Sequence, residues 1–142
     1  MKKLLLLLGL VALGGSGCGY TDIVRTKELK ALDVRCVHIE PIQSENQYAG
    51  QVLRDVLQKE FIRSKVQLCD PNTATVLITG SAFMTVRSIS DNPGNEAIES
   101  VSLMARDQAG RILLTASYDN KKQYTASKLA KEFGRAVAGK LR

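Results

Sequence analysis

The stretch ATVLITGSAFMTVRSIS, residues 74–90, indicates the fold of this chain. It is rich in β-branched side chains and contains no proline, as is typical of a strand. We therefore expect one long strand from Thr75 to Ile89. Gly80 lies inside it, and a glycine in a strand marks either a bulge or a close approach of another backbone.

The residues that follow predict an antiparallel meander and a closing helix. The turn cluster SDNPGNE (90–96) leads to AIESVSLMARD (97–107), and the tight turn DQAG (107–110) leads to RILLTASYD (111–119). Residues 125–142 then read as an amphipathic helix. Its apolar face is formed by Ala126, Leu129, Ala130, Phe133, Val137 and Leu141.

The residues before the long strand predict a β-α-β unit. DVRCVHIEPI (33–42) alternates in polarity, QYAGQVLRDVLQKEFIRSK (47–65) has a helical apolar stripe, and KVQLC (65–69) reads as a second strand. That stripe contains Val52, Leu53, Val56, Leu57 and Phe61. The expected fold is one α+β domain over residues 31–142, in the order β-α-β-β-β-β-α. It has a mixed sheet of about five strands with two helices on one face.

The N-terminus has the layout of a signal peptide. Lys2 and Lys3 precede an apolar run from Leu4 to Leu13, about ten residues, which is too short for the roughly 20 that a membrane span needs. We expect residues 1–17 to be removed. Their loss lowers the formal charge from +6 to +4, a mildly basic value that suits anionic lipid or polysaccharide.

Cys18 indicates lipid attachment. GSGCGY (15–20) resembles a bacterial lipobox, although Gly15 stands where leucine is usual. Two or three acyl chains on Cys18, palmitate among them, would hold the protein on a membrane almost permanently. Gly19 after the cysteine favours the periplasmic face of the outer membrane, with residues 18–30 as a tether. The alternative is an ordinary secreted protein in which Cys18 is incidental.

The other two cysteines face the same expected environment. Matching strand parity places Cys36 and Cys69 on one face of the sheet. An oxidising periplasm would preserve a bridge between them, and parity alone leaves open either a Cys36–Cys69 disulfide or two buried free thiols.

No residue pattern predicts catalysis. His38 is the single histidine and lies in the middle of a strand, and we find no cofactor motif and no metal-ligand set at recognisable spacing. The few aromatic residues and the export signal argue against nucleic-acid binding. We therefore expect a binding or structural module that is not an enzyme and carries no cofactor.

GCGY (17–20), the β-α-β start, ATVLITG (74–80) and the closing helix together resemble the LptE family of lipopolysaccharide-assembly lipoproteins. The resemblance covers the whole chain in element order. ATVLITG keeps Ala74, Leu77 and Gly80 of the family pattern, with Thr75 in place of an acid.

The resemblance implies a non-catalytic plug inside the outer-membrane β-barrel LptD. The plug would help the barrel to assemble and to pass lipopolysaccharide to the cell surface. The resemblance also implies lipopolysaccharide contacts at Lys121 and Lys122 before the last helix and at Arg87 near the acidic hairpin tip. Phe83, Met84 and Ile98 are candidates for partner contact, with core packing as the other explanation. The alternative function is a lipoprotein adaptor that activates a cell-wall synthase or forms part of a secretion or transport assembly. The short tether favours a partner in the same membrane.

Overall fold

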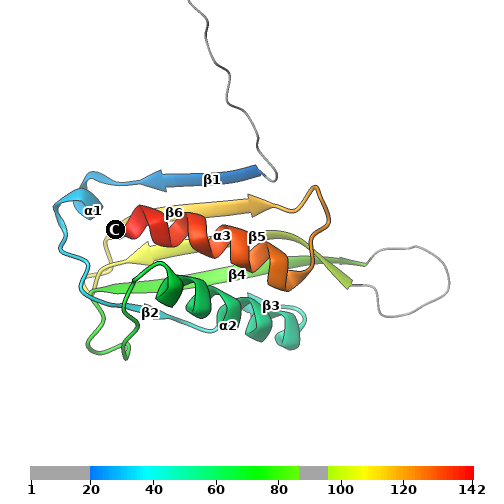
Figure 1. Cartoon of the computed structure of the whole chain (residues 1–142), viewed down its shortest axis with the longest axis horizontal. Coiled ribbons are helices and arrows are strands. Elements are labelled where there is room, and N and C mark those ends of the chain that lie inside the picture. Colours follow the sequence, from blue (N-terminus) through cyan, green and yellow to red (C-terminus); the bar gives the residue numbers. More distant parts are fainter. Residues whose placement is uncertain (1–19, 87–95) are drawn as a thin grey trace, which may run out of the picture.

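Strands β4 (Val76–Val86) and β5 (Glu96–Arg106) form the centre of the sheet (Figure 1). The computed structural model describes residues 20–86 and 96–142. Antiparallel pairing runs from Leu77 opposite Arg106 to Val86 opposite Glu96, and β6 (Ile112–Asp119) pairs with the other edge of β5. The predicted three-stranded meander is therefore confirmed, and residues 87–89 of the predicted strand and most of the predicted turn cluster lie outside the described residues.

The turn between β5 and β6 is held by one carboxylate. Asp107 accepts hydrogen bonds from the backbone amides of Ala109 (3.0 Å) and Arg111 (2.9 Å), and Arg111 Nε donates to it at 2.7 Å. Gly110 takes a φ of 83°, which a side chain would disfavour. The backbone amide of Arg111, the largest cause, holds the pKa of Asp107 below its ordinary value with help from the guanidinium and Ala109.

Strand β1 (Tyr20–Arg25) corrects the expected tether at residues 18–30. It pairs antiparallel with β6, from Tyr20 opposite Asp119 to Arg25 opposite Leu114, and α1 (Lys27–Ala31) follows it. The tether prediction is wrong for residues 20–30, because β6 offers an edge to which β1 adds and α1 follows that strand. The first described strand thus begins two residues after Cys18 in the sequence.

At the opposite edge, β2 (Val37–Ile39) and β3 (Gln43–Ser44) both pair in parallel with β4. The predicted strand at residues 65–69 is wrong, since a single parallel bridge joins Val37 to Leu68. A longer ladder is limited by the three residues of β2 and by Lys65, whose φ is 62°. Within the described residues the sheet has six strands, in the order β1-β6-β5-β4-β2 with β3 beside β4.

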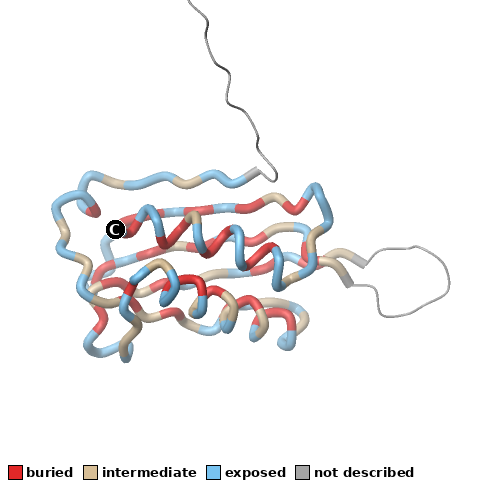
Figure 2. The backbone as a smooth tube through the Cα atoms, viewed as in Figure 1, coloured by how far each residue is buried: buried red, intermediate tan, exposed pale blue. Residues whose placement is uncertain are grey.

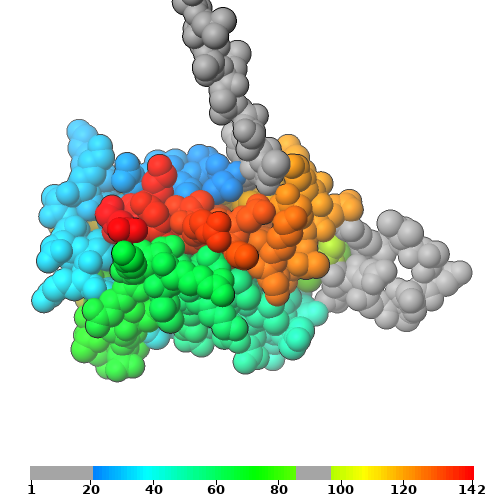
Figure 3. All heavy atoms as spheres, in the orientation of Figure 1, coloured from blue at the N-terminus to red at the C-terminus, as the bar shows by residue number. Residues whose placement is uncertain are grey.

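Helices α2 (Gln47–Arg63) and α3 (Ala126–Leu141) lie side by side on one face of the sheet (Figures 1 and 3). The side chains of Asn46 and Thr125 cap them by accepting backbone hydrogen bonds. Both predicted helices and the α+β class with helices on one face are confirmed. Within residues 20–86 and 96–142, no helix combines the length and apolar character that spanning a membrane requires.

The core fills the space between these helices and the sheet (Figure 2). Gly80 faces this core, where a Cβ would lie 2.4 Å from Leu103 Cδ2 and 2.9 Å from the carbonyl oxygen of Ser102. Its pairing with Leu103 is regular, and the nearest irregularity lies between Phe83 and Met84. Of the two interpretations of Gly80, close packing is the one that the structure shows.

Candidate interaction site

The face of the sheet opposite the helices is exposed along its central strands. We call it the open face and define it by exposed side chains at alternate strand positions: Thr79, Ser81 and Phe83 of β4, Ser102 of β5, and Thr115 and Ser117 of β6. Among the described segments, both long helices lie on the other face (Figure 1). A sheet buried on one side only normally alternates apolar and polar residues in this way.

An open hollow lies on this face and reaches across the sheet from β1 to β3. Its lining includes small hydroxyl side chains of the open face together with Val24, Pro41 and Met104. Only Asp22 and Glu40 among its lining residues carry a charged side chain, and both are acidic. Small side chains let another backbone approach closely, so this surface suits contact with a polypeptide.

Two large apolar side chains are exposed on this side of the sheet, and one of them, Val24, lines the hollow. Phe83 is 58% exposed on the open face, and Val24 of the edge strand β1 is 56% exposed. Met84 and Ile98 instead pair across β4 and β5 and point into the core, where both are buried. Of the three apolar residues that the sequence singles out, Phe83 alone is available to a partner.

Two of the three basic residues expected to contact lipopolysaccharide, Lys121 and Lys122, belong to the described residues. Lys121 and Lys122 are exposed in the turn between β6 and α3, and Lys121 Nζ lies 3.5 Å from the carboxylate of Asp119. Arg87 and Cys18 fall outside the described residues. The structure therefore places one of the two basic regions.

Asn120 fixes that turn and is a residue that sequence reasoning missed. Its amide nitrogen donates to the carbonyls of Ile98 (2.7 Å) and Tyr124 (3.0 Å), and its Oδ1 accepts from the Tyr124 amide at 2.8 Å. Asn120 is buried, whereas an asparagine in a turn is ordinarily exposed. Only the position of Asn120 directly after a predicted strand could have drawn attention to it.

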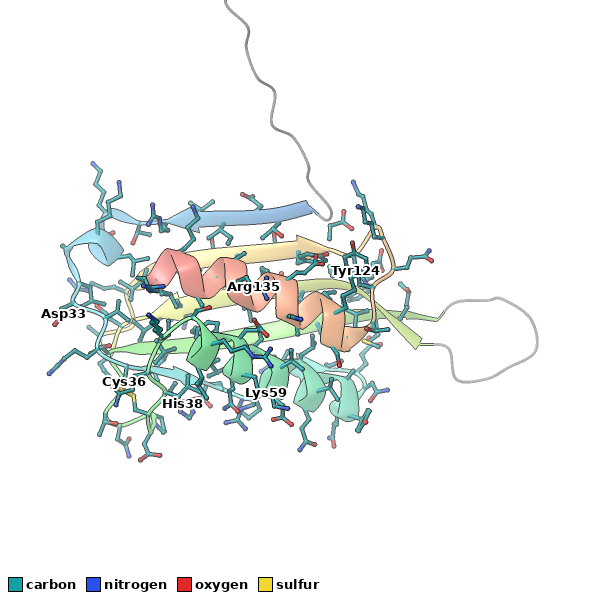
Figure 4. All side chains as sticks on the ribbon, viewed as in Figure 1. Asp33, Cys36, His38, Lys59, Tyr124 and Arg135 are labelled. Carbon is teal, nitrogen blue, oxygen red and sulfur yellow. A yellow bond between two sulfur atoms is a disulfide. The ribbon has the colours of Figure 1, made fainter. Side chains whose placement is uncertain are left out.

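Cys36 and Cys69 form a disulfide with a Cα–Cα distance of 5.9 Å. It ties the residue before β2 to the segment that follows α2, and His38 Nδ1 lies 2.9 Å from the carbonyl oxygen of Cys69. The other ring nitrogen of His38 lies 3.8 Å from Glu40. His38 thus sits in a set of structural contacts at the sheet edge (Figure 4).

The described residues bring together no cluster of three or more His, Cys, Asp or Glu side chains that could hold a metal ion. The buried carboxylate of Glu60 faces the guanidinium groups of Arg63 and Arg135, the latter at 3.7 Å. Because Arg135 belongs to α3, this group joins the two helices, which Figure 4 shows side by side. Its arrangement serves packing between helices.

Comparison with known proteins identifies the fold. No family model matches the chain, and no curated protein matches it. The PelC dodecamer from Paraburkholderia phytofirmans is similar in structure, with a TM-score of 0.62 and 15% identity over 87% of this chain and 96% of that one. A DUF4136 family protein from Bacteroides thetaiotaomicron has a TM-score of 0.57 and 9% identity over 87% of this chain and 97% of that one.

A third similar structure belongs to a larger protein. A PDZ domain protein from Parabacteroides distasonis has a TM-score of 0.56 and 12% identity, over 82% of this chain and 34% of that one. The class defined by these comparisons is a small α+β fold shared with PelC and the DUF4136 protein. At these identities the likeness concerns the fold alone.

Proposed function

We propose that this protein is a lipid-anchored, non-catalytic subunit of an outer-membrane export assembly, which docks on its partner through the open face. The observation that carries this proposal is the asymmetry of the sheet. Two helices bury one face, while the other exposes Phe83 and an open hollow lined by small side chains. Exposed surfaces of this kind on small domains commonly mark protein interaction sites.

The membrane part of the proposal rests on the lipobox-like GSGCGY at residues 15–20. Acyl chains on Cys18 would keep the domain at the membrane, since only Gly19 separates that residue from β1. The non-catalytic part is supported by the contacts of His38 and Glu60, each of which is explained by packing.

The first candidate assembly is the lipopolysaccharide-translocating barrel, with this chain as an LptE-like plug of an LptD-type partner. Two helices on one face of a mixed sheet agree with that family's fold. Lys121 and Lys122, exposed before α3, remain candidates for phosphate-bearing lipid. The open face would then contact the barrel.

The second candidate is a ring built from copies of this chain as part of a secretion assembly. It is favoured by the similarity to the PelC dodecamer, whose chain is covered almost completely. In that case the partner of the open face would be a neighbouring copy.

Affinity purification of the tagged, full-length protein from detergent-solubilised outer membranes tests these candidates. A β-barrel in roughly equal amount supports the plug, and a homo-oligomer in native mass spectrometry supports the ring. A monomer that brings down neither contradicts the proposal, and absence of acyl chains on Cys18 contradicts its membrane part.

A matched pair of variants tests the role of the open face. Ser102→Arg places a long charged side chain on β5 in the hollow, and Gln51→Arg makes the same charge change on exposed α2. We expect Ser102→Arg to reduce partner recovery at least about tenfold, because an unpaired charge in an interface is costly. Equal recovery with both variants, at unchanged Tm, would refute this role.

A further inference from the structure

Basic side chains are concentrated in the last part of the chain. Residues 120–142 contain seven Lys and Arg and one acid, Glu132, a formal charge of +6. Residues 18–119 contain eleven basic and thirteen acidic residues, a formal charge of −2. The protein after removal of residues 1–17 is therefore strongly asymmetric in charge, although its net charge is only mildly positive.

The first of these basic residues lie at the end of the sheet where the chain enters the fold. Tyr20 pairs with Asp119 at the start of β1, and Lys121 and Lys122 follow Asp119 by two and three residues. The lipid-bearing position, Cys18, precedes Tyr20 by two residues. An anchor at Cys18 would thus hold this end of the sheet close to the membrane surface.

The same end of the fold carries the first turns of α3. Lys128 Nζ lies 4.0 Å from the centre of the Tyr124 ring, and the amide of Lys128 is bonded by the Thr125 cap. Lys131 follows one turn later, and both lysine side chains are exposed. Figure 4 shows Tyr124 beside the N-terminal end of α3. Asn120 holds the backbone of the turn between β6 and α3 through hydrogen bonds to Ile98 and Tyr124.

We propose that Lys121, Lys122, Lys128 and Lys131, which we call the basic end patch, rest on anionic phospholipid headgroups of the membrane that holds the protein's own lipid. This inference depends on the proposed lipid anchor at Cys18. Each basic residue held near an anionic bilayer strengthens the binding of a protein to that bilayer by roughly fivefold. Asp119 offsets part of the charge of Lys121, and Lys128 and Lys131 on the first turns of α3 add two exposed positive charges.

The basic end patch would set the orientation of the domain on the membrane, which the lipid alone would not do. Acyl chains on Cys18 would attach the domain at one point and would not by themselves set its orientation over the bilayer. A second attachment at the same end of the sheet restricts rotation of the domain and gives the open face a defined direction. Lipid plus a basic surface is a common pair of signals for membrane attachment.

Lysine reactivity on vesicles tests the inference. The full-length protein is purified from membranes and its acylation is measured by mass spectrometry. It is then added to vesicles of phosphatidylcholine alone or with about 30% phosphatidylglycerol, and each lysine is labelled with a sulfonated acylating reagent and quantified. We expect Lys122, Lys128 and Lys131 to react at least about threefold more slowly on the anionic vesicles, and about 0.5 M salt to abolish the difference. Lys27 and Lys30 on α1 serve as internal controls.

A charge-reversed pair separates specific contact from general attraction. Lys128→Glu with Lys131→Glu should remove the protection of Lys122, whereas Lys27→Glu with Lys30→Glu makes the same change of charge and should leave it. If the protein binds both neutral and anionic vesicles and Lys122, Lys128 and Lys131 react equally on both, the basic end patch is refuted. The proposed lipid anchor would not be affected by that result. A protein that carries no acyl chains and binds neither vesicle would overturn both.

Discussion

Asn120 shows how much of the arrangement at one end of the molecule depends on a single side chain. Its amide satisfies two carbonyls and one backbone N–H in a buried turn, and so sets where β6 ends and α3 begins. Buried polar groups left without partners are costly, which makes such a residue hard to replace. Lys121 and Lys122 of the basic end patch lie in this turn.

Asn120→Ala should lower the free energy of unfolding by about 2–4 kcal/mol, because it leaves buried backbone groups unpaired. Asn46→Ala is the matched control, since the amide of Asn46 caps α2 through the amides of Tyr48 and Ala49 near the surface. Losing a helix cap costs about 1 kcal/mol. Urea denaturation of the two variants measures the difference, and an equal loss in both would contradict the special role of Asn120.

Asp107 makes stability depend on acid pH. Because hydrogen bonds lower its pKa in the folded state, the unfolded chain takes up a proton first as the pH falls. The stabilisation is complete above the ordinary pKa of an aspartate and is lost as the pH falls through the lowered value. We expect Asp107→Asn to lower Tm at neutral pH and to flatten the fall of Tm on acidification, as measured by thermal unfolding across pH. A parallel fall in both proteins would contradict this assignment.

At the scale of elements, segments with a regular apolar pattern could be predicted from the sequence. Segments that form only because a distant strand pairs with them could not. The strand at 76–86, its hairpin partner and both long helices carry enough apolar residues in regular spacing to specify their own structure. Strand β1 has two aliphatic residues, Ile23 and Val24. It forms because β6, some ninety residues later in the chain, offers an edge to which β1 pairs. Residues 65–69 look like a strand but lack a partner long enough to pair with.

Gly80 gives a test of how tightly β4 and β5 pack. Gly80→Ala should destabilise the protein by about 1–3 kcal/mol, because its Cβ would meet Leu103 and the Ser102 carbonyl. Gly139→Ala is the control, since nothing lies within 4 Å of its added Cβ on α3. That change should instead stabilise by about 0.5–1 kcal/mol. Chemical denaturation gives both values, and stabilisation by Gly80→Ala would refute the packing argument.

At the scale of the whole molecule, the disulfide restrains the unfolded chain more than it shapes the folded one. It closes a loop between residues 33 apart in sequence. Replacing Cys36 and Cys69 by serine should lower the free energy of unfolding by about 3–4 kcal/mol. A reducing agent should have the same effect on the wild type and none on the double variant. Unfolding in urea with and without reductant decides this, and an unchanged wild-type midpoint on reduction would contradict it.

The candidate surface could be only partly predicted from the sequence. Phe83, Met84 and Ile98 look alike as apolar strand residues, and only the irregular pairing near Phe83 and the position of the helices decide which side chain is exposed. The hollow combines residues from β1, β3, β4, β5 and β6, so no local pattern describes it. Lys121 and Lys122 could be selected because a turn before a helix is exposed in most folds.

Strand β1 would also transmit force from an anchored Cys18 to the rest of the sheet. The chain passes from Cys18 through one glycine into a strand whose whole length is paired with β6. Any tension between an anchored Cys18 and a partner bound at the open face therefore passes first through the β1–β6 backbone hydrogen bonds. Pulled along the strand, those bonds share the load and must break together. With a lipid on Cys18, β1 would be the element through which the membrane pulls on this domain.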